Sequence, residues 1–213
     1  MTAATATLAR RTRSSGTSHV AALVVLATGA IVLLARPFVG GSVGTRIALF
    51  AASYVAIGSA AVTVADGRAP SRGATEPGAT SRPSAPGDGA IPVGATLVVG
   101  LAAIALAPIV AGPPVPSPWV AATLPLSILA AVAEEALFRR VAFAQLQRIG
   151  GPAIAVVGSA ALFALVHLPA YGTTALPVDL GAGLLFGWQR WASGTWTVPA
   201  TTHAAANLLV VLR

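Results

Sequence analysis

Two adjacent carboxylates, Glu134 and Glu135, lie within one of the most apolar stretches of the sequence. Residues 119–132, just before them, carry no charge, and the whole chain has only six acidic residues. Ionisable side chains are costly in such surroundings and therefore mark functional sites. On a helix, Glu135 and Arg139 share a face and are expected to form an ion pair. Glu134, about 100° further round the helix, is then free for chemistry.

Two histidines follow, each in an apolar segment and each four residues from a second notable side chain. Phe163 precedes His167, and Asn207 follows His203. A spacing of four residues places both members of a pair on one face of a helix. Three helical segments therefore each present polar groups on one face, and a site forms where these faces meet.

If such a site hydrolyses a peptide bond, the residue types restrict how it can do so. Hydrolysis needs a nucleophile, a proton carrier and donors to the developing oxyanion. The chain has no cysteine, which excludes a thiol nucleophile and a thiolate metal site. Ser127 and Ser159 lie in apolar runs without the GxSxG motif that accompanies a serine nucleophile. Activated water remains as the nucleophile.

Glu134 and His167 are the candidates for activating that water. A carboxylate in an apolar site can take a proton from water and return it to the leaving amine. His203 and Asn207 can donate hydrogen bonds to the oxyanion that develops on the attacked carbonyl. The four side chains are therefore predicted to line one cavity.

Plainer interpretations exist for each residue alone. The two glutamates could act only as an ion-pair clamp with Arg139 and Arg140, and each histidine could be a buried core residue. Phe163 is expected to pack, either orienting His167 or lining a substrate groove. Two glutamates and two histidines could also bind zinc, although the chain has no HExxH motif. The joint pattern favours the hydrolytic site.

The three patterns are EExxxR at 134–139, FxxxH at 163–167 and HxxxN at 203–207. In this order they resemble the CPBP family, which comprises CAAX prenyl proteases of the Rce1 type and the bacteriocin-processing or immunity relatives of the Abi group. The resemblance extends over residues 119–213 and implies an intramembrane protease of the glutamic type.

The resemblance also implies roles for individual side chains. No cofactor is implied, and zinc remains the alternative. One departure is Arg140, because a glycine commonly follows the motif arginine in this family. The implied catalytic residues are Glu134 and His167 for water activation and His203 and Asn207 for the oxyanion, with Glu135, Arg139 and Phe163 in supporting roles.

Composition indicates an integral membrane protein. Of the 213 residues, 55% are hydrophobic and 9% charged, and the mean hydropathy is +0.80. Soluble domains have about 25% charged residues. The net charge of +7 comes from arginine alone. These arginines are scattered between apolar spans, which excludes a nucleic-acid-binding face and suits anchors at the membrane surface.

The predicted fold class is all-α, a polytopic transmembrane helical bundle with about seven spans. A cleaved signal peptide is the alternative for the first apolar run, but a retained span is favoured. The stretch rich in Gly, Pro and Ser cannot bury a core and is predicted to be a flexible loop. The expected divisions are a tail at 1–18, two helices at 19–65, the loop at 66–92, and a CPBP-like core at 93–213 whose motif match covers 119–213.

Orientation follows from the arginines. A cytoplasmic N-terminus, and with it a cytoplasmic tail and loop, places most arginines in the cytoplasm, with Arg36, Arg46 and Arg213 as exceptions. We expect a multi-pass protein of the plasma membrane, whose partners are the lipid bilayer and a membrane-associated protein or peptide substrate, not nucleic acid. Its oligomeric state is left open.

The helical rise predicts the depth of the site. If the chain turns at Gly150 and Gly151, Glu134 and His167 both lie ~24 Å from that turn and are level with each other. Two rival functions are a non-catalytic immunity or scaffold protein and a proton-coupled transporter. A single unduplicated chain disfavours the transporter.

Overall fold

The computed structural model describes residues 3–66, 91–111 and 120–211. The described part is almost entirely helical and contains no strand, which confirms the all-α fold class. The predicted loop at 66–92 lies almost entirely outside the described residues. The helices are α1 (Ala3–Ala35), α2 (Val43–Asp66), α3 (Val93–Ala111), α4 (Val120–Glu135), α5 (Phe143–Tyr171), α6 (Leu176–Ser193) and α7 (Thr197–Val211), with short segments η1 (Arg36–Phe38), η2 (Ala136–Ala142) and η3 (Thr173–Ala175).

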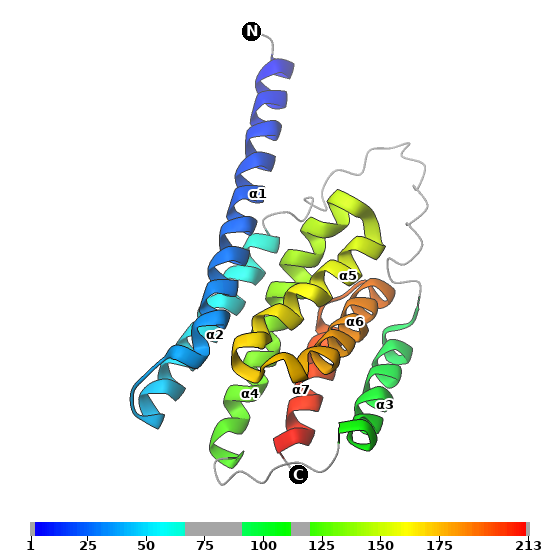
Figure 1. The fold of residues 1–213 in the computed structure, drawn as a ribbon. Coiled ribbons are helices and arrows are strands. Elements are labelled where there is room, and N and C mark those ends of the chain that lie inside the picture. Colours follow the sequence, from blue (N-terminus) through cyan, green and yellow to red (C-terminus); the bar gives the residue numbers. More distant parts are fainter. Residues whose placement is uncertain (1–2, 67–90, 112–119, 212–213) are drawn as a thin grey trace.

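The helices form one bundle with α4 and α5 at its centre (Figure 1). The hairpin of α1 and α2 lies on one side, where α2 packs against α4. On the other side α6 packs against α5, α7 packs against α4, and α3 covers α6 and α7. The three segments that carry the motifs are therefore neighbours in the bundle.

The N-terminal hairpin turns at Arg36 and Pro37. Proline lacks an N–H and is tolerated in a first helical turn, so α1 ends here and the short η1 begins. Helix α1 starts at Ala3, so the described part of residues 1–18 is helical and continues into the first predicted span. A cluster of buried apolar side chains joins this hairpin to the rest of the bundle. Its members are Leu33, Tyr54, Ile57, Ala133, Leu137, Phe138, Phe163, Val166 and Phe186.

Among the residues that the structure describes, three segments are long and apolar enough to cross a membrane: His19–Phe38, Val43–Val64 and Thr123–Tyr171. Large apolar side chains on these segments face outward, among them Ile31, Val55 and Val157. Together they support an integral membrane protein, because an outward apolar surface of this kind suits lipid. The count of about seven spans is not confirmed.

The central segment departs from a uniform helix directly after the two glutamates. Residues Ala136–Ala142 form a π-helix, in which the N–H of Phe143 bonds to the carbonyl of Phe138. The π-helix was not predicted from the sequence. Such π segments are rare and are frequent at functional sites.

The predicted turn at Gly150 and Gly151 is present. Both residues have non-helical backbone angles, and Gly151 has φ +74°, a conformation that side chains beyond glycine rarely adopt. Pro152 then opens the second half of α5. This turn lets the two arms of the hairpin return side by side.

Glycines bring α6 close to α5, since Gly183 and Gly187 have the GxxxG spacing that permits close approach of two helices. A Cβ on Gly183 would lie 2.9 Å from the Cα of Ala160, and one on Gly187 would lie 3.1 Å from the carbonyl oxygen of Val156. Both glycines lie within α6. Its close approach places the backbone of Gly183 within reach of a buried arginine described below.

Candidate active site

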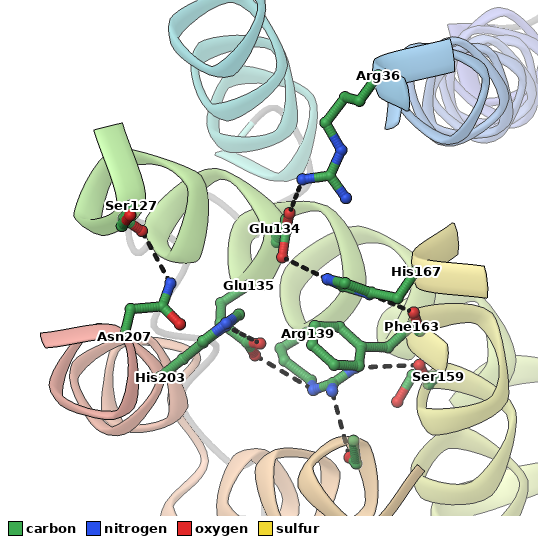
Figure 2. A network of polar contacts seen from close by, with 11 residues as sticks. Arg36, Ser127, Glu134, Glu135, Arg139, Ser159, Phe163, His167, His203 and Asn207 are labelled. Atoms are coloured by element: carbon green, nitrogen blue, oxygen red, sulfur yellow. Dashed lines mark hydrogen bonds and ion pairs between the residues drawn. The ribbon is translucent and has the colours of Figure 1, made fainter. Parts of the chain in front are cut away.

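Glu134, near the end of α4, contacts groups from two other parts of the bundle (Figure 2). Its Oε1 accepts a hydrogen bond of 2.9 Å from Nη1 of Arg36, which belongs to η1. Its Oε2 lies 3.6 Å from Nε2 of His167, on α5. The side chain of Glu134 is only 3% exposed. The two carboxylate oxygens therefore face different partners.

His167 is held by Phe163, one turn earlier on α5. Its Nδ1 donates a hydrogen bond of 2.8 Å to the carbonyl oxygen of Phe163, a contact that fixes the ring orientation. The two rings lie 4.4 Å apart, and Tyr171 stacks on the other side of His167 with centroids 5.7 Å apart. The FxxxH pattern thus turns Nε2 of the histidine toward Glu134.

Glu135 has a separate set of partners. Its Oε2 lies 3.2 Å from Nε of Arg139, an ion pair without hydrogen-bond alignment. Its Oε1 lies 3.1 Å from Nδ1 of His203, on α7. The side chains of Glu135 and Arg139 are completely buried. The ion pair expected from the four-residue spacing is therefore present.

Arg139 is fixed on every side. Its Nη1 donates to the carbonyl of Ser159 at 3.1 Å, and its Nη2 donates to the carbonyl of Gly183 at 3.2 Å. Its guanidinium also lies over the rings of Phe163 and Phe186, at 5.4 and 5.9 Å from their centroids. These contacts join α4, α5 and α6 around one buried cation.

The HxxxN pair on α7 faces α4. His203 stacks on Phe186 with centroids 5.0 Å apart and meets the edge of Phe163 at 5.5 Å. Nδ2 of Asn207 donates a hydrogen bond of 2.9 Å to the carbonyl of Ser127. The ring of Phe163 therefore contacts both imidazoles: that of His167, which faces Glu134, and that of His203, which faces Glu135.

The four predicted catalytic residues thus form two neighbouring groups rather than one directly bonded cluster. Glu134 and His167 contact each other, whereas His203 contacts Glu135 and Asn207 contacts the backbone of α4. The sequence predicted all four side chains around one cavity, and the partner of His203 was not foreseen.

Sequence reasoning missed two residues beside Glu134. One is Arg36, which entered only as an exception to the arginine distribution. The other is Asp179, on the first turn of α6, which interacts electrostatically with His167, Glu134 and His203. Its Oδ2 is buried and has no hydrogen-bond partner in the described part of the chain. Its rarity as one of six acidic residues was the available signal.

No three histidine or carboxylate side chains are grouped so as to hold a metal ion among residues that the structure describes. The two histidines turn toward different glutamates, so the zinc alternative finds no shared ligand set there. The expectation that the site needs no cofactor remains a prediction.

A shallow apolar cavity of about 350 Å³ lies between α4 and α7. Its lining includes Val132, three residues before Glu135, and Ala204, which follows His203. The remaining lining residues are Trp196, Thr197, Ala200 and Thr201.

Residues 116–209 match a protein-family model described as type II CAAX prenyl endopeptidase Rce1-like. No curated protein and no solved structure matches the chain. The matched region contains all three motifs and α4 to α7 almost completely, but not the α1–α2 hairpin. It confirms the resemblance drawn from the motifs and, at the level of the family, a protease. Residues 116–209 thus resemble the Rce1-like type II CAAX prenyl endopeptidases, which supports a protease at the level of the family.

Proposed function

We propose that this protein is an intramembrane endopeptidase that hydrolyses a peptide bond of a membrane-associated protein or peptide precursor. Water activated by Glu134 and His167 is the nucleophile. The observation that carries the proposal is the 3.6 Å separation between Oε2 of Glu134 and Nε2 of His167. This is too long for a direct hydrogen bond but lets one water bond to both atoms.

In the attack, Glu134 takes the proton of this water as the oxygen bonds to the scissile carbonyl carbon. His167, whose Nδ1 is committed to the carbonyl of Phe163, orients the water through Nε2. The protonated carboxyl then returns the proton to the leaving amine as the carbon–nitrogen bond breaks. The low exposure of Glu134 supports this role, because a buried site excludes competing water.

His203 and Asn207 supply donors to the oxyanion. Asn207 uses one N–H on the carbonyl of Ser127, and an amide has a second to offer. His203 approaches Glu135 through Nδ1, so its Nε2 donates only when the ring is doubly protonated. The carboxylate of Glu135 accepts from Nδ1 and holds the orientation of the ring. Glu135 and Arg139 therefore support the oxyanion donor rather than attack the substrate.

A non-catalytic scaffold or immunity protein is the second candidate. The observation that favours it is the ion pair of Glu134 with Arg36, because a structural clamp also uses a carboxylate in this way. The scaffold needs no reactive Glu134, so the two functions differ in what removal of its charge does. A zinc-dependent protease is the remaining alternative, which chelation distinguishes.

The test uses purified protein in proteoliposomes with two internally quenched peptides that end in a CAAX sequence, one prenylated and one not. We expect cleavage of at least one peptide, unaffected by EDTA and lost with Glu134→Gln. Cleavage that EDTA stops and zinc restores would establish the metal alternative. Absence of cleavage of both peptides, together with full biological complementation by Glu134→Gln, would establish the scaffold.

A further inference from the structure

We infer that Arg36 is a positioning residue of the active site: it orients the carboxylate of Glu134 toward His167. This rests on the proposed function, since it assigns Glu134 the role of base. Arg36 lies 98 residues before Glu134 and outside the region that matches the protease family. The α1–α2 hairpin would therefore complete the site and not only anchor the protein in the membrane.

The guanidinium of Arg36 is itself held in place. Its Nε donates to the carbonyl of Leu33 at 3.1 Å, within the same turn. Its Nη1 donates to the hydroxyl of Tyr54 at 2.8 Å as well as to Glu134. The side chain of Arg36 is 13% exposed, and Tyr54 is buried on α2. Contacts with α1 and α2 thus hold the guanidinium in place independently of Glu134.

This cation selects one oxygen of Glu134. Arg36 takes Oε1, and Oε2 is left facing His167. Because Arg36 holds one oxygen, rotation of the carboxylate plane is restricted. The other oxygen, which would bind the water, therefore stays directed at Nε2 of His167. Displacements of about 1 Å at a reacting group can cost ~10²-fold in rate, which makes such fixing effective.

Charge supports the same contact. Arg139 is already compensated by Glu135, and Asp179 adds a negative charge near Glu134. Arg36 is the cation in direct contact with Glu134, at 2.9 Å. The contact therefore joins a charged pair whose two members come from distant parts of the chain.

Arg36 also differs from an arginine with a purely structural role. Both terminal nitrogens of Arg139 donate to backbone carbonyls. In contrast, Nη2 of Arg36 is buried without a hydrogen-bond partner in the described part of the chain. A buried unpaired donor costs about 1–3 kcal/mol, and such groups are tolerated where function requires them.

The first measurement reads the contact between Arg36 and Glu134 without any substrate. Infrared difference spectra report the carboxylate stretching bands, whose frequencies change with the hydrogen bonds that the group accepts. We expect Arg36→Gln to shift these bands relative to wild type, Arg36→Lys to shift them less, and Glu134→Gln added to Arg36→Gln to remove the shifted bands. Arg46→Gln, at an exposed position of α2, is the matched control and should resemble wild type. A spectrum of Arg36→Gln identical to wild type would overturn the inference.

The second measurement is cleavage of the quenched CAAX peptides. We expect Arg36→Gln to lower kcat by ~10²-fold with KM nearly unchanged, and Arg36→Lys to recover part of this loss. Increased activity of Arg36→Gln would show that the ion pair is an inhibitory latch and would overturn the positioning role. If Arg36→Gln does not fold, Tyr54→Phe is the second variant, because it removes the hydroxyl that holds Nη1 of Arg36. Tyr54→Phe should give a smaller change of the same kind in both measurements. No change in either measurement would contradict the inference.

The two measurements distinguish a failure of the proposed protease function from a failure of the role inferred for Arg36. A wild-type protein that cleaves neither peptide contradicts the proposed protease, yet the infrared band still reports whether Arg36 controls Glu134. Normal cleavage with no effect of Arg36→Gln on the band or on kcat contradicts the role of Arg36 alone.

Discussion

Glu134 and Glu135 are neighbours in the chain, yet they belong to different environments. Glu135 pairs with an arginine of its own helical segment and with His203, and its side chain is completely buried. Glu134 pairs with Arg36 from a distant hairpin and faces His167 across a gap. The roughly 100° between successive helical residues directs the two carboxylates toward different helices.

The difference separates a structural ion pair from a reactive one. The cation of Arg139 has two backbone carbonyls, two aromatic faces and Glu135 around it. Glu134 keeps one oxygen turned toward a histidine at a distance that accommodates water.

The largest effect is expected from Glu135→Gln. Arg139 would keep its charge in a fully buried place without its compensating carboxylate. Breaking a buried ion pair by removing one partner costs about 3–5 kcal/mol. Thermal unfolding of purified protein in detergent should show a strongly lowered Tm. An unchanged Tm would mean that the two carboxylates do not differ as described.

A somewhat smaller effect is expected from Asn207→Ala, and it should appear in the rate. Loss of an oxyanion donor costs about 10²–10³ in kcat, because the donor acts mainly in the transition state. Steady-state kinetics should therefore show a lower kcat with little change in KM. The control is Ser127→Ala, which keeps the backbone carbonyl that Asn207 binds. A pure rise in KM would assign Asn207 to substrate binding instead.

The smallest effect is expected from Gly183→Ala, which disturbs the surroundings of Arg139 and not those of Glu134. The added Cβ would lie 2.9 Å from the backbone of Ala160 and push α6 from α5. Overpacking of this kind costs about 1–3 kcal/mol. Gly181→Ala, with nothing within 4 Å of the added atom, is the matched control for denaturation measurements. Equal stability of the two variants would contradict the close packing.

The sequence allowed prediction of contacts that follow from short spacings. The pair of Glu135 and Arg139 depends on two residues four positions apart. The equal depth of Glu134 and His167 in the bundle was predicted by counting the helical rise on either side of the turn at Gly150 and Gly151. Periodicity and regular geometry are sufficient for these features.

Other features depend on how distant helices meet, which spacing does not encode. Arg36 reaches Glu134 only because the α1–α2 hairpin packs against α4, and in the sequence it was one more arginine at the end of a span. The pairing of His203 with Glu135 rather than with Glu134 depends on the rotation of α7. The π-helix after Glu135 has no signal in apolar periodicity, since it changes which residues face the core by a fraction of a turn.

The central claim is that Glu134 is the reactive carboxylate. The most direct measurement is cleavage per folded molecule by Glu134→Gln in proteoliposomes, with circular dichroism and thermal unfolding to verify the fold. Glutamine keeps the size of the side chain and an oxygen for Arg36 but removes the base. General-base catalysis contributes about 10²–10⁴ in rate, so we predict a loss of at least ~10²-fold with near-normal stability. A Glu134→Gln protein that cleaves at the wild-type rate would contradict the account.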